Sequence, residues 1–179
     1  MKTYVALLRG INVVGANNLP MERLRARCSA LGFKDVRTYI QTGNVVFRSE
    51  ASKAEVQGSL ERMLKREMKK PVVVVLRTPA ELAKILKANP YLDEAGVDVK
   101  HLHVSFLTTK ASAEAVTALS RVQSGRDRFA ARGKELFLHC PDGFGTSKLA
   151  AAHERVLRVA TTVRNWNTVT KLLEMAIIT

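Results

Sequence analysis

The sequence predicts an α+β fold in which two structural repeats pack into one compact body. Strand-like and helix-like patterns alternate along the 179 residues. Up to residue 77 they follow the order strand, helix, strand, strand, helix, strand, and a similar order begins again near residue 100. This order is the βαββαβ plan of ferredoxin-like folds. We therefore expect two ferredoxin-like repeats.

The first four elements of the first repeat have simple signals. Residues 3–8 form an apolar run typical of a strand, and the next helix has Pro20 near its start and Gly32 placed to end it. The stretch "VRTYIQTGNVVFRS" then predicts two strands. They are separated by Gly43-Asn44, which suits a two-residue type II′ hairpin turn.

A helix and a strand complete the first repeat. The helix spans about residues 53–68 and places four apolar side chains on one face, those of Val56, Leu60, Met63 and Leu64. "PVVVVLR" follows and is almost entirely apolar. Such a run predicts a strand that is covered on both faces of the sheet.

The second half repeats this order with one difference. A linking helix begins at Thr78-Pro79 and stops before Asn89-Pro90. The pattern then predicts a strand, a helix, two strands and two helices, at residues 100–107, 112–119, 127–132, 135–140, 147–159 and 165–177. We expect the last strand of this repeat to be missing or replaced by a helix.

The chain accordingly divides into three parts. The N-terminal repeat covers residues 1–77, a linking helix and loop cover 78–99, and a related C-terminal repeat covers 100–179 and ends in two helices. Residues 89–99, "NPYLDEAGVDV", form the best boundary between the repeats.

Composition predicts a cytoplasmic protein without a membrane partner. The 46% of hydrophobic residues suffice for a core, yet no apolar run approaches the ~20 residues of a membrane helix. The N-terminus enters a strand instead of a signal peptide. Cys28 and Cys140 are too few for a disulfide framework and lack metal-ligand spacing, so we expect both to be core thiols.

The net charge of +13 is concentrated in the first half. Up to Asn89 there are 17 Lys+Arg and 7 Asp+Glu, against 12 and 9 from Pro90 onward. Six of the basic residues belong to the first two helices: Arg23, Arg25, Arg27, Arg62, Lys65 and Arg66. Such a charge favours binding to nucleic acid or another polyanion, and it also serves solubility alone.

The loop "RGINVVGANN" separates the first strand from the first helix. Gly10 and Gly15 have the spacing of a phosphate-binding P-loop, but Ala16 and Asn17 stand where that loop needs Lys and Ser or Thr. The pattern therefore argues against a nucleotide hydrolase of that class. Two interpretations stay open, an anion site built from backbone N–H groups and Arg9, or a plain turn.

Strand directions in the first repeat bring polar segments together. The loop after the first strand, the "QTGNVV" turn and Lys69-Lys70 are expected at one end of the sheet. Alternation places Arg37, Tyr39 and Gln41 on the face away from the helices. We expect this face to look toward the second repeat and to line a cleft.

Two polar clusters occur in the second repeat. "PDGFGTSKL" places Ser147 and Lys148 at a helix start, where free N–H groups bind a phosphate or are simply capped. "TTVRNWNTVTKLLEM" surrounds the start of the last helix with Arg164, Asn165, Asn167 and Lys171, and Thr162 or Asn165 is expected to cap it. The buried stripe of this helix is expected to contain Trp166, Val169, Leu173 and Ala176.

Catalytic and metal-binding patterns are weak. His101 and His103 share one side of a strand without a third ligand nearby, and His139 and His153 are isolated. Neither a nucleophile with its base nor a pair of carboxylates can be assembled from spacing. The sequence thus names no cofactor and no reaction.

Two long stretches resemble a known family. "YVALLRGINVVGANNLPMERLRARCSALGFKDVRTYIQTGNVVF" and the terminal "TTVRNWNTVTKL" are similar to the bacterial family called domain of unknown function 1697. The resemblance implies an α+β fold of two related halves and no established function. Val14 replaces a glycine of the family's loop, and Thr42 replaces a serine of its hairpin.

The first functional hypothesis is the binding of a small anionic or phosphate-bearing ligand in a cleft between the repeats. The alternatives are nucleic-acid binding through the basic N-terminal half, an enzyme of unidentified reaction, and a protein whose polar motifs are internal networks. The candidate ligand-binding residues are Arg9, Asn12, Arg37, Tyr39, Gln41, Asn44, Ser147, Lys148, Arg164, Asn165 and Lys171.

Overall fold

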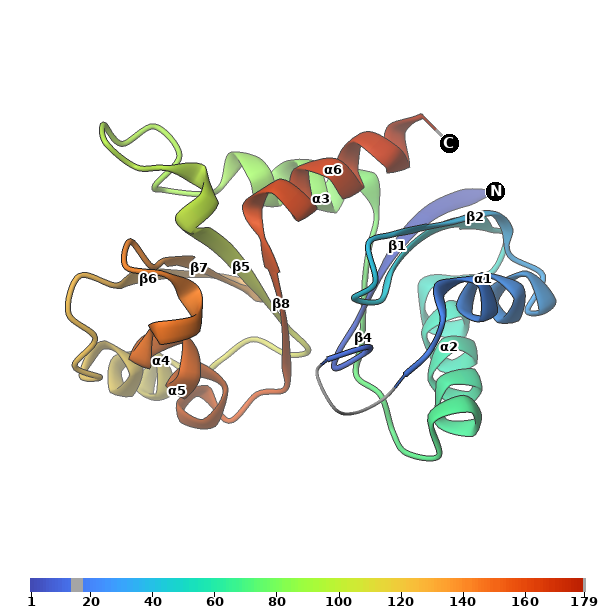
Figure 1. Cartoon of the computed structure of the whole chain (residues 1–179), viewed down its shortest axis with the longest axis horizontal. Helices are drawn as coiled ribbons and strands as arrows, with labels where there is room; N and C mark the ends of the chain where they lie inside the picture. The colour runs from blue at the N-terminus through green and yellow to red at the C-terminus, as the bar shows by residue number, and fades with distance from the viewer. Residues whose placement is uncertain (14–17, 179) are drawn as a thin grey trace. The chain divides into compact units, whose positions relative to one another are not determined.

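The computed structural model describes residues 1–13 and 18–178. The chain divides into two compact units. The first unit comprises Met1–Ala83 together with Lys171–Thr179, and the second comprises Lys84–Thr170 (Figure 1). Two helices cross the division, α3 (Pro79–Lys87) and α6 (Trp166–Ile177). No helix in the described ranges is both long and apolar enough to cross a membrane.

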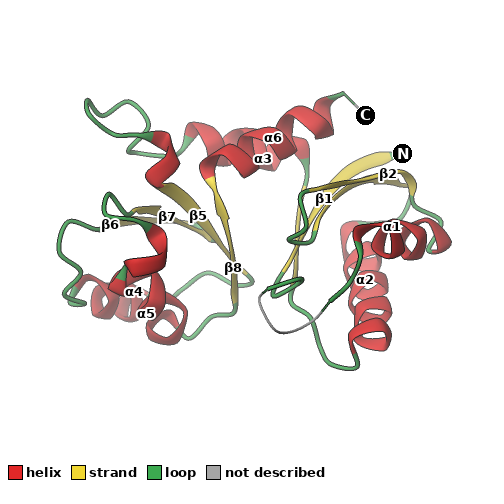
Figure 2. Ribbon diagram, viewed as in Figure 1, coloured by secondary structure: helices red, strands yellow, loops and turns green. Residues whose placement is uncertain are grey.

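The first unit has the predicted ferredoxin-like order. Its elements are β1 (Lys2–Leu8), α1 (Met21–Ala30), β2 (Lys34–Tyr39), β3 (Asn44–Ser49), α2 (Lys53–Met68) and β4 (Val74–Arg77). The sheet order is β2-β3-β1-β4, and every neighbouring pair is antiparallel. Helices α1 and α2 cover one face of this sheet (Figure 2).

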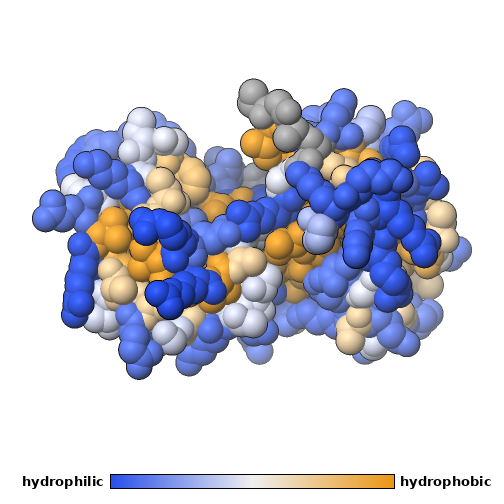
Figure 3. Space-filling view, turned by 90° about the horizontal axis from the view of Figure 1, so that it is seen from below, coloured by the Kyte–Doolittle hydropathy of each residue, from blue (hydrophilic) through white to orange (hydrophobic). Residues whose placement is uncertain are grey.

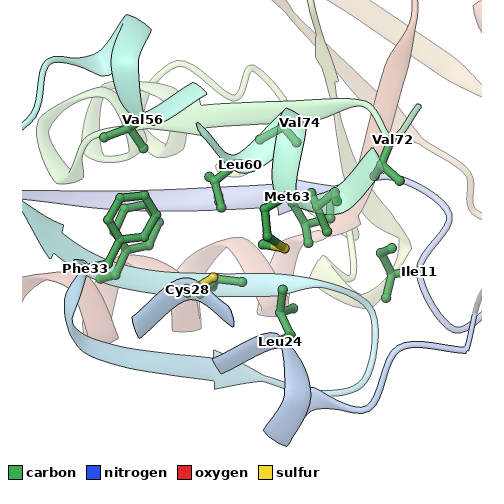
Figure 4. Packing of buried hydrophobic residues seen from close by; sticks show 14 of the residues in the cluster. Ile11, Leu24, Cys28, Phe33, Val56, Leu60, Met63, Val72 and Val74 are labelled. Atoms are coloured by element: carbon green, nitrogen blue, oxygen red, sulfur yellow. The ribbon is translucent and has the colours of Figure 1, made fainter. Parts of the chain in front are cut away.

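Alternation along β1 divides the apolar side chains between two faces. Tyr4, Ala6 and Leu8 belong to the core beneath α1 and α2, where Phe33 and Phe47 stack with centroids 4.3 Å apart. Figure 4 shows apolar side chains from both helices turned into this core. The intervening side chains of β1 and their neighbours are also buried, so the sheet is apolar on both faces, as the continuous apolar runs predict.

The hairpin between β2 and β3 is longer than predicted. Tyr39 pairs with Asn44, so residues 40–43 form a four-residue turn and the predicted two-residue Gly43-Asn44 turn is wrong. Ile40 and Gly43 have positive φ, 47° and 75°. The Asn44 side chain donates to the Tyr39 carbonyl at 3.0 Å and to Thr42 Oγ1 at 3.1 Å, which holds the longer turn closed.

The second unit repeats the same plan. Its elements are a 3₁₀ turn (Val99–His101), β5 (Leu102–Leu107), α4 (Ala113–Ser120), β6 (Arg128–Arg132), β7 (Glu135–His139), a 3₁₀ turn (Phe144–Thr146), α5 (Lys148–Leu157) and β8 (Thr161–Asn165). Its sheet order is β6-β7-β5-β8, again antiparallel throughout.

Strand β8 corrects the prediction that the last strand is missing or replaced by a helix. Thr161, Thr162 and Val163 are β-branched and pair with β5, and α6 begins only at Trp166. The repeat is therefore complete. In α6 itself Leu172 is fully buried whereas Leu173 is half-buried, so the predicted stripe is shifted by one residue at that turn.

Equivalent positions in the two sheets carry equivalent arginines. The N–H groups of Leu8 and Leu107 bond the carbonyls of Gly43 and Lys134, which aligns β1 with β5. In this alignment Arg77 and Arg164 correspond, and both are 8% exposed. Each guanidinium donates to the carbonyl of its preceding residue, at 2.9 and 2.8 Å. The two repeats thus share a buried arginine at the same position of the last strand.

Candidate functional site

The polar segments of the first unit meet at one end of its sheet, as the strand directions predict. The Leu8 N–H donates to the Gly43 carbonyl at 2.9 Å, and the Arg9 N–H donates to the Val73 carbonyl at 3.0 Å. The loop after β1, the β2–β3 turn and the approach to β4 are therefore neighbours. The Arg9 side chain is exposed at this end. Residues 14–17, including Val14, Gly15, Ala16 and Asn17, lie outside the described residues.

Asn12 joins three segments at this end of the sheet. Its Nδ2 donates to the carbonyls of Leu19 at 2.9 Å and Gln41 at 2.8 Å, and its Oδ1 accepts from the Leu19 N–H at 2.7 Å. Asn12 also has a φ of 54°, which asparagine tolerates better than most residues. Its side chain therefore ties the loop after β1 to the start of α1 and to the β2–β3 turn.

The other candidates of the first unit also contact the protein itself. Arg37 lies on the face away from α1 and donates through Nη2 to the Met175 carbonyl of α6 at 2.5 Å. Asn44 is fully buried and closes the hairpin. Lys171 pairs with Glu174 at 3.0 Å, one turn along α6. Tyr39 is half-buried and the Gln41 side chain is exposed.

The candidates of the second unit serve mainly as helix caps. Ser147 is buried and accepts the Ala150 N–H at 2.9 Å, which caps α5. Asn165 accepts the Thr168 N–H at 2.8 Å, so Asn165, not Thr162, caps α6. Lys148 is exposed. Each cap satisfies backbone N–H groups that a bound phosphate would otherwise satisfy.

Arg164 is buried, and two of its hydrogen bonds go to neutral oxygen atoms. Its Nη1 donates to Thr162 Oγ1 and to the Val163 carbonyl, both at 2.8 Å. Burial lowers the pKa of the Arg164 guanidinium to about 10. The ligand-binding role of the eleven candidates stays a prediction, and for Asn12, Arg37, Ser147 and Asn165 it requires an anion to replace these internal bonds.

A basic surface extends over α1 and α2. We call it the basic face: Arg23, Arg25, Arg27, Arg62, Lys65, Arg66, Lys69 and Lys70, all exposed except Arg25, which is half-buried. In the view from below, the right-hand part of the surface is mostly hydrophilic (Figure 3). Glu67, with a side chain 9% exposed, accepts from Arg23 Nε and Arg27 Nε at 2.6 Å each and joins the two helices.

Two polar networks of the second unit were not predicted because their members are distant in sequence. In the first, Arg128 Nη2 donates to Glu94 Oε2 at 2.6 Å and to His139 Nδ1 at 3.1 Å, and the guanidinium lies 4.7 Å from the Tyr91 ring centroid. In the second, the buried His153 Nε2 bonds Ser105 Oγ at 2.9 Å. Both histidines, isolated in sequence, have partners.

The Ser105–His153 contact is a structural bond of the core. His153 Nδ1 lies 2.7 Å from the Ala150 carbonyl, which can only accept, so Nδ1 carries the proton and Nε2 accepts from Ser105. Ser105 is fully buried. No group of His, Cys, Asp and Glu side chains suited to a metal occurs among residues 1–13 and 18–178. His103 instead stacks on Phe144, with centroids 4.2 Å apart.

We expect the stability of the fold to decrease below neutral pH through His139. Burial and the Arg128 charge lower the pKa of His139 below its usual 6.5, and burial also lowers the pKa of His103. The unfolded chain then binds these protons first, so unfolding becomes easier as pH falls through about 6.5, by at most about 1.4 kcal/mol per pH unit and proton. Thermal melts between about pH 5 and pH 7 measure this, and His139→Gln should flatten the slope.

Comparison with known proteins decides the family. A model described as "Protein of unknown function (DUF1697)" matches residues 1–137. The chain belongs to this family. This confirms the resemblance in the sequence. A DUF1697 assignment brings no activity with it, and the search of curated proteins returned no match.

One solved structure shares the fold of this DUF1697 chain over its whole length. It is described as the conserved bacterial protein SP0830 from Streptococcus pneumoniae, and it is 25% identical with a TM-score of 0.78. The similarity covers 99% of both chains. Both repeats, including the second one beyond residue 137, thus occur in that protein.

Proposed function

We propose that this DUF1697 protein binds a polyanion, of which nucleic acid is the main class, through the basic face. The observation that carries the proposal is the contrast between the polar residues of the loop and cap motifs and the cationic residues of the basic face. The loop and cap motifs are engaged in internal bonds. On the basic face, Arg23 and Arg27 share Glu67, and Arg25 and Arg62 bond the hydroxyl groups of Thr38 and Ser59. The side chains of its other four members are exposed and have no bonded partner among the described residues: Lys65, Arg66, Lys69 and Lys70. Phosphate contacts of this kind supply most non-specific affinity for nucleic acid.

Charge and the geometry of arginine support the basic face as the binding surface. The first unit carries 16 Lys+Arg and 8 Asp+Glu, a formal charge of +8, against 13 and 8 in the second unit. Glu67 accepts from both Arg23 and Arg27, and its one negative charge neutralises only one of these two positive charges. The guanidinium group of arginine can bind a phosphate through two N–H groups at once.

The experiment is fluorescence anisotropy with a labelled DNA duplex over a series of salt concentrations. We expect binding at low salt and a log–log slope of about −4, which corresponds to four or five neutralised phosphates. Lys65→Ala/Lys69→Ala/Lys70→Ala should make this slope shallower by about one unit for each phosphate that is no longer bound. The control Lys110→Ala/Arg121→Ala/Arg155→Ala removes three exposed charges from the second unit. Equal weakening by both triple variants, or no binding at low salt, would contradict the proposal.

A small phosphate-bearing ligand is the second candidate. It is favoured by the convergence of the exposed Arg9 with the β2–β3 turn at the sheet end where β4 begins. A nucleotide should then raise the melting temperature, and Arg9→Ala should abolish this rise, measured against the melting temperature of the same variant without nucleotide. Arg164 does not suit this test because it is buried and its loss would itself destabilise the second unit.

A further inference from the structure

The edges of the two sheets differ in how well they are protected. A strand at a sheet edge presents backbone N–H and C=O groups without partners, and proteins usually block such edges with bulges, side chains or short strands. The four edge strands here are β2 and β4 in the first sheet and β6 and β8 in the second. Three of them are either irregular or carry side-chain bonds on outer carbonyls.

Side chains bond two outer carbonyls of β4 and one outer carbonyl of β8. In β4, Gln57 Nε2 donates to the Val74 carbonyl at 2.6 Å and Arg77 donates to the Leu76 carbonyl at 2.9 Å. In β8, Arg164 donates to the Val163 carbonyl at 2.8 Å. Strand β2 is irregular instead, because its register shifts between Lys34 and Arg37 and Asp35 has a φ of 51°.

Strand β6 has a regular and nearly uncovered outer edge. At the two ends of the β5–β7 ladder, the Leu107 N–H donates to the Lys134 carbonyl and the Cys140 N–H donates to the His101 carbonyl. In β7 the even-numbered residues therefore bond β5, and the odd-numbered residues bond β6. By alternation Arg128, Ala130 and Arg132 bond β7, so the backbone groups of Phe129 and Ala131 point outward. Among the described residues their one partner is Arg132 Nη1, 3.5 Å from the Ala131 carbonyl, which is too long for a strong bond.

We propose that the outer edge of β6 binds an extended acidic segment of a partner protein, which adds to the second sheet as a fifth strand. This mode of recognition uses main-chain hydrogen bonds for affinity and alternate side chains for specificity. The N–H and C=O groups of Phe129 and Ala131 provide four such bonds.

Charge determines which partner fits this edge. Within the described chain neither Arg132 nor Lys134, at the tip of the β6–β7 hairpin, is paired with a carboxylate, and both are exposed. An acidic residue opposite Arg132 would form a favourable cross-strand pair. A second copy of this chain fits poorly. If two β6 strands pair in antiparallel fashion with Phe129 of one opposite Ala131 of the other, Arg128 lies opposite the second copy's Arg132, and like charges repel.

The test uses a labelled, blocked hexapeptide of alternating valine and glutamate, with the full-length protein and anisotropy as the readout. Two versions carry N-methyl groups, one on its valines and the other on its glutamates, so that side chains and charge are unchanged. Edge pairing uses the N–H groups of alternate residues only. We expect one methylated version to bind about tenfold or more weakly and the other to retain binding.

Two further measurements identify the surface. Amide exchange of Phe129 and Ala131, followed by NMR, should slow when the unmethylated peptide is added, while Ala130, already bonded to β7, should not change. Arg132→Gln removes the charge without placing a second carboxylate opposite Glu135, and it should weaken binding while the fold stays intact. Equal binding of both methylated peptides would show attraction by charge alone and overturn the proposal. If amide exchange of Phe129 and Ala131 slowed as the protein concentration was raised without peptide, the edge would bind a second copy of this chain. That result would also overturn the proposal.

Discussion

Replacing Asn12 with alanine is expected to lower the free energy of unfolding by about 3 kcal/mol. The variant loses three hydrogen bonds and leaves the N–H of the buried Leu19 without its partner, which costs about 1–3 kcal/mol. It also forces alanine to adopt a φ of 54°, which adds about 1 kcal/mol. Urea unfolding followed by circular dichroism measures the change.

Two further variants at this position separate the contributions. Asn12→Gly removes the backbone strain and keeps the loss of bonds, so it should be more stable than Asn12→Ala by about 1 kcal/mol. Asn12→Asp keeps the acceptor for Leu19 and loses both donated bonds. If Asn12→Ala were as stable as the natural chain, the asparagine side chain would not hold these three segments together.

Replacing Gly43 with alanine is expected to cost about 2–4 kcal/mol. A Cβ at this position would lie 2.9 Å from Leu8 Cβ and 3.1 Å from Ile11 Cβ, both parts of the buried core. Neither atom is at the flexible end of a side chain, so the β2–β3 turn or the end of β1 must move. Thermal unfolding and a spectrum of the backbone amides would report the loss and the displacement.

Gly32→Ala is the matched control for Gly43→Ala. Gly32 has a φ of 85°, similar to the 75° of Gly43, but nothing lies within 4 Å of its added Cβ. It should therefore cost only the strain of a left-handed backbone, about 1 kcal/mol. Equal losses for the two variants would mean that strain alone, and not close packing of the turn on β1, makes glycine necessary at position 43.

Much of the fold follows from local signals in the sequence. Ser52 and Glu55 form a capping box, Gly32 ends α1, and the apolar periods place α2 and β4 almost where the structure has them. The predicted position of the hairpin turn is wrong because the turn depends on Ile40 at positive φ. β-branched residues rarely adopt this conformation, so the sequence gives no reason to expect it there. Strand β8 was missed because its polar residues also fit a helix start.

The candidate site was harder to predict than the fold. The type of a side chain shows what bonds it can form, yet its partner depends on chain segments far away in sequence. Asn12 meets Gln41, Arg37 meets Met175, and His153 meets Ser105. In contrast, most of the basic face could be predicted from the sequence, because six of its eight residues lie on the two predicted helices and only Lys69 and Lys70 follow the end of α2.

The most direct test of the whole account is an NMR titration of the full-length protein with a short DNA duplex at low salt. If the basic face is the binding surface and the polar motifs are internal ties, the largest amide shifts will occur in α1, in α2 and at Lys69 and Lys70. The β2–β3 turn and the residues around Asn12 will change little. The largest shifts at residues 9–12 and 40–43, with α1 and α2 unchanged, would contradict the account and favour a ligand site at that end of the sheet.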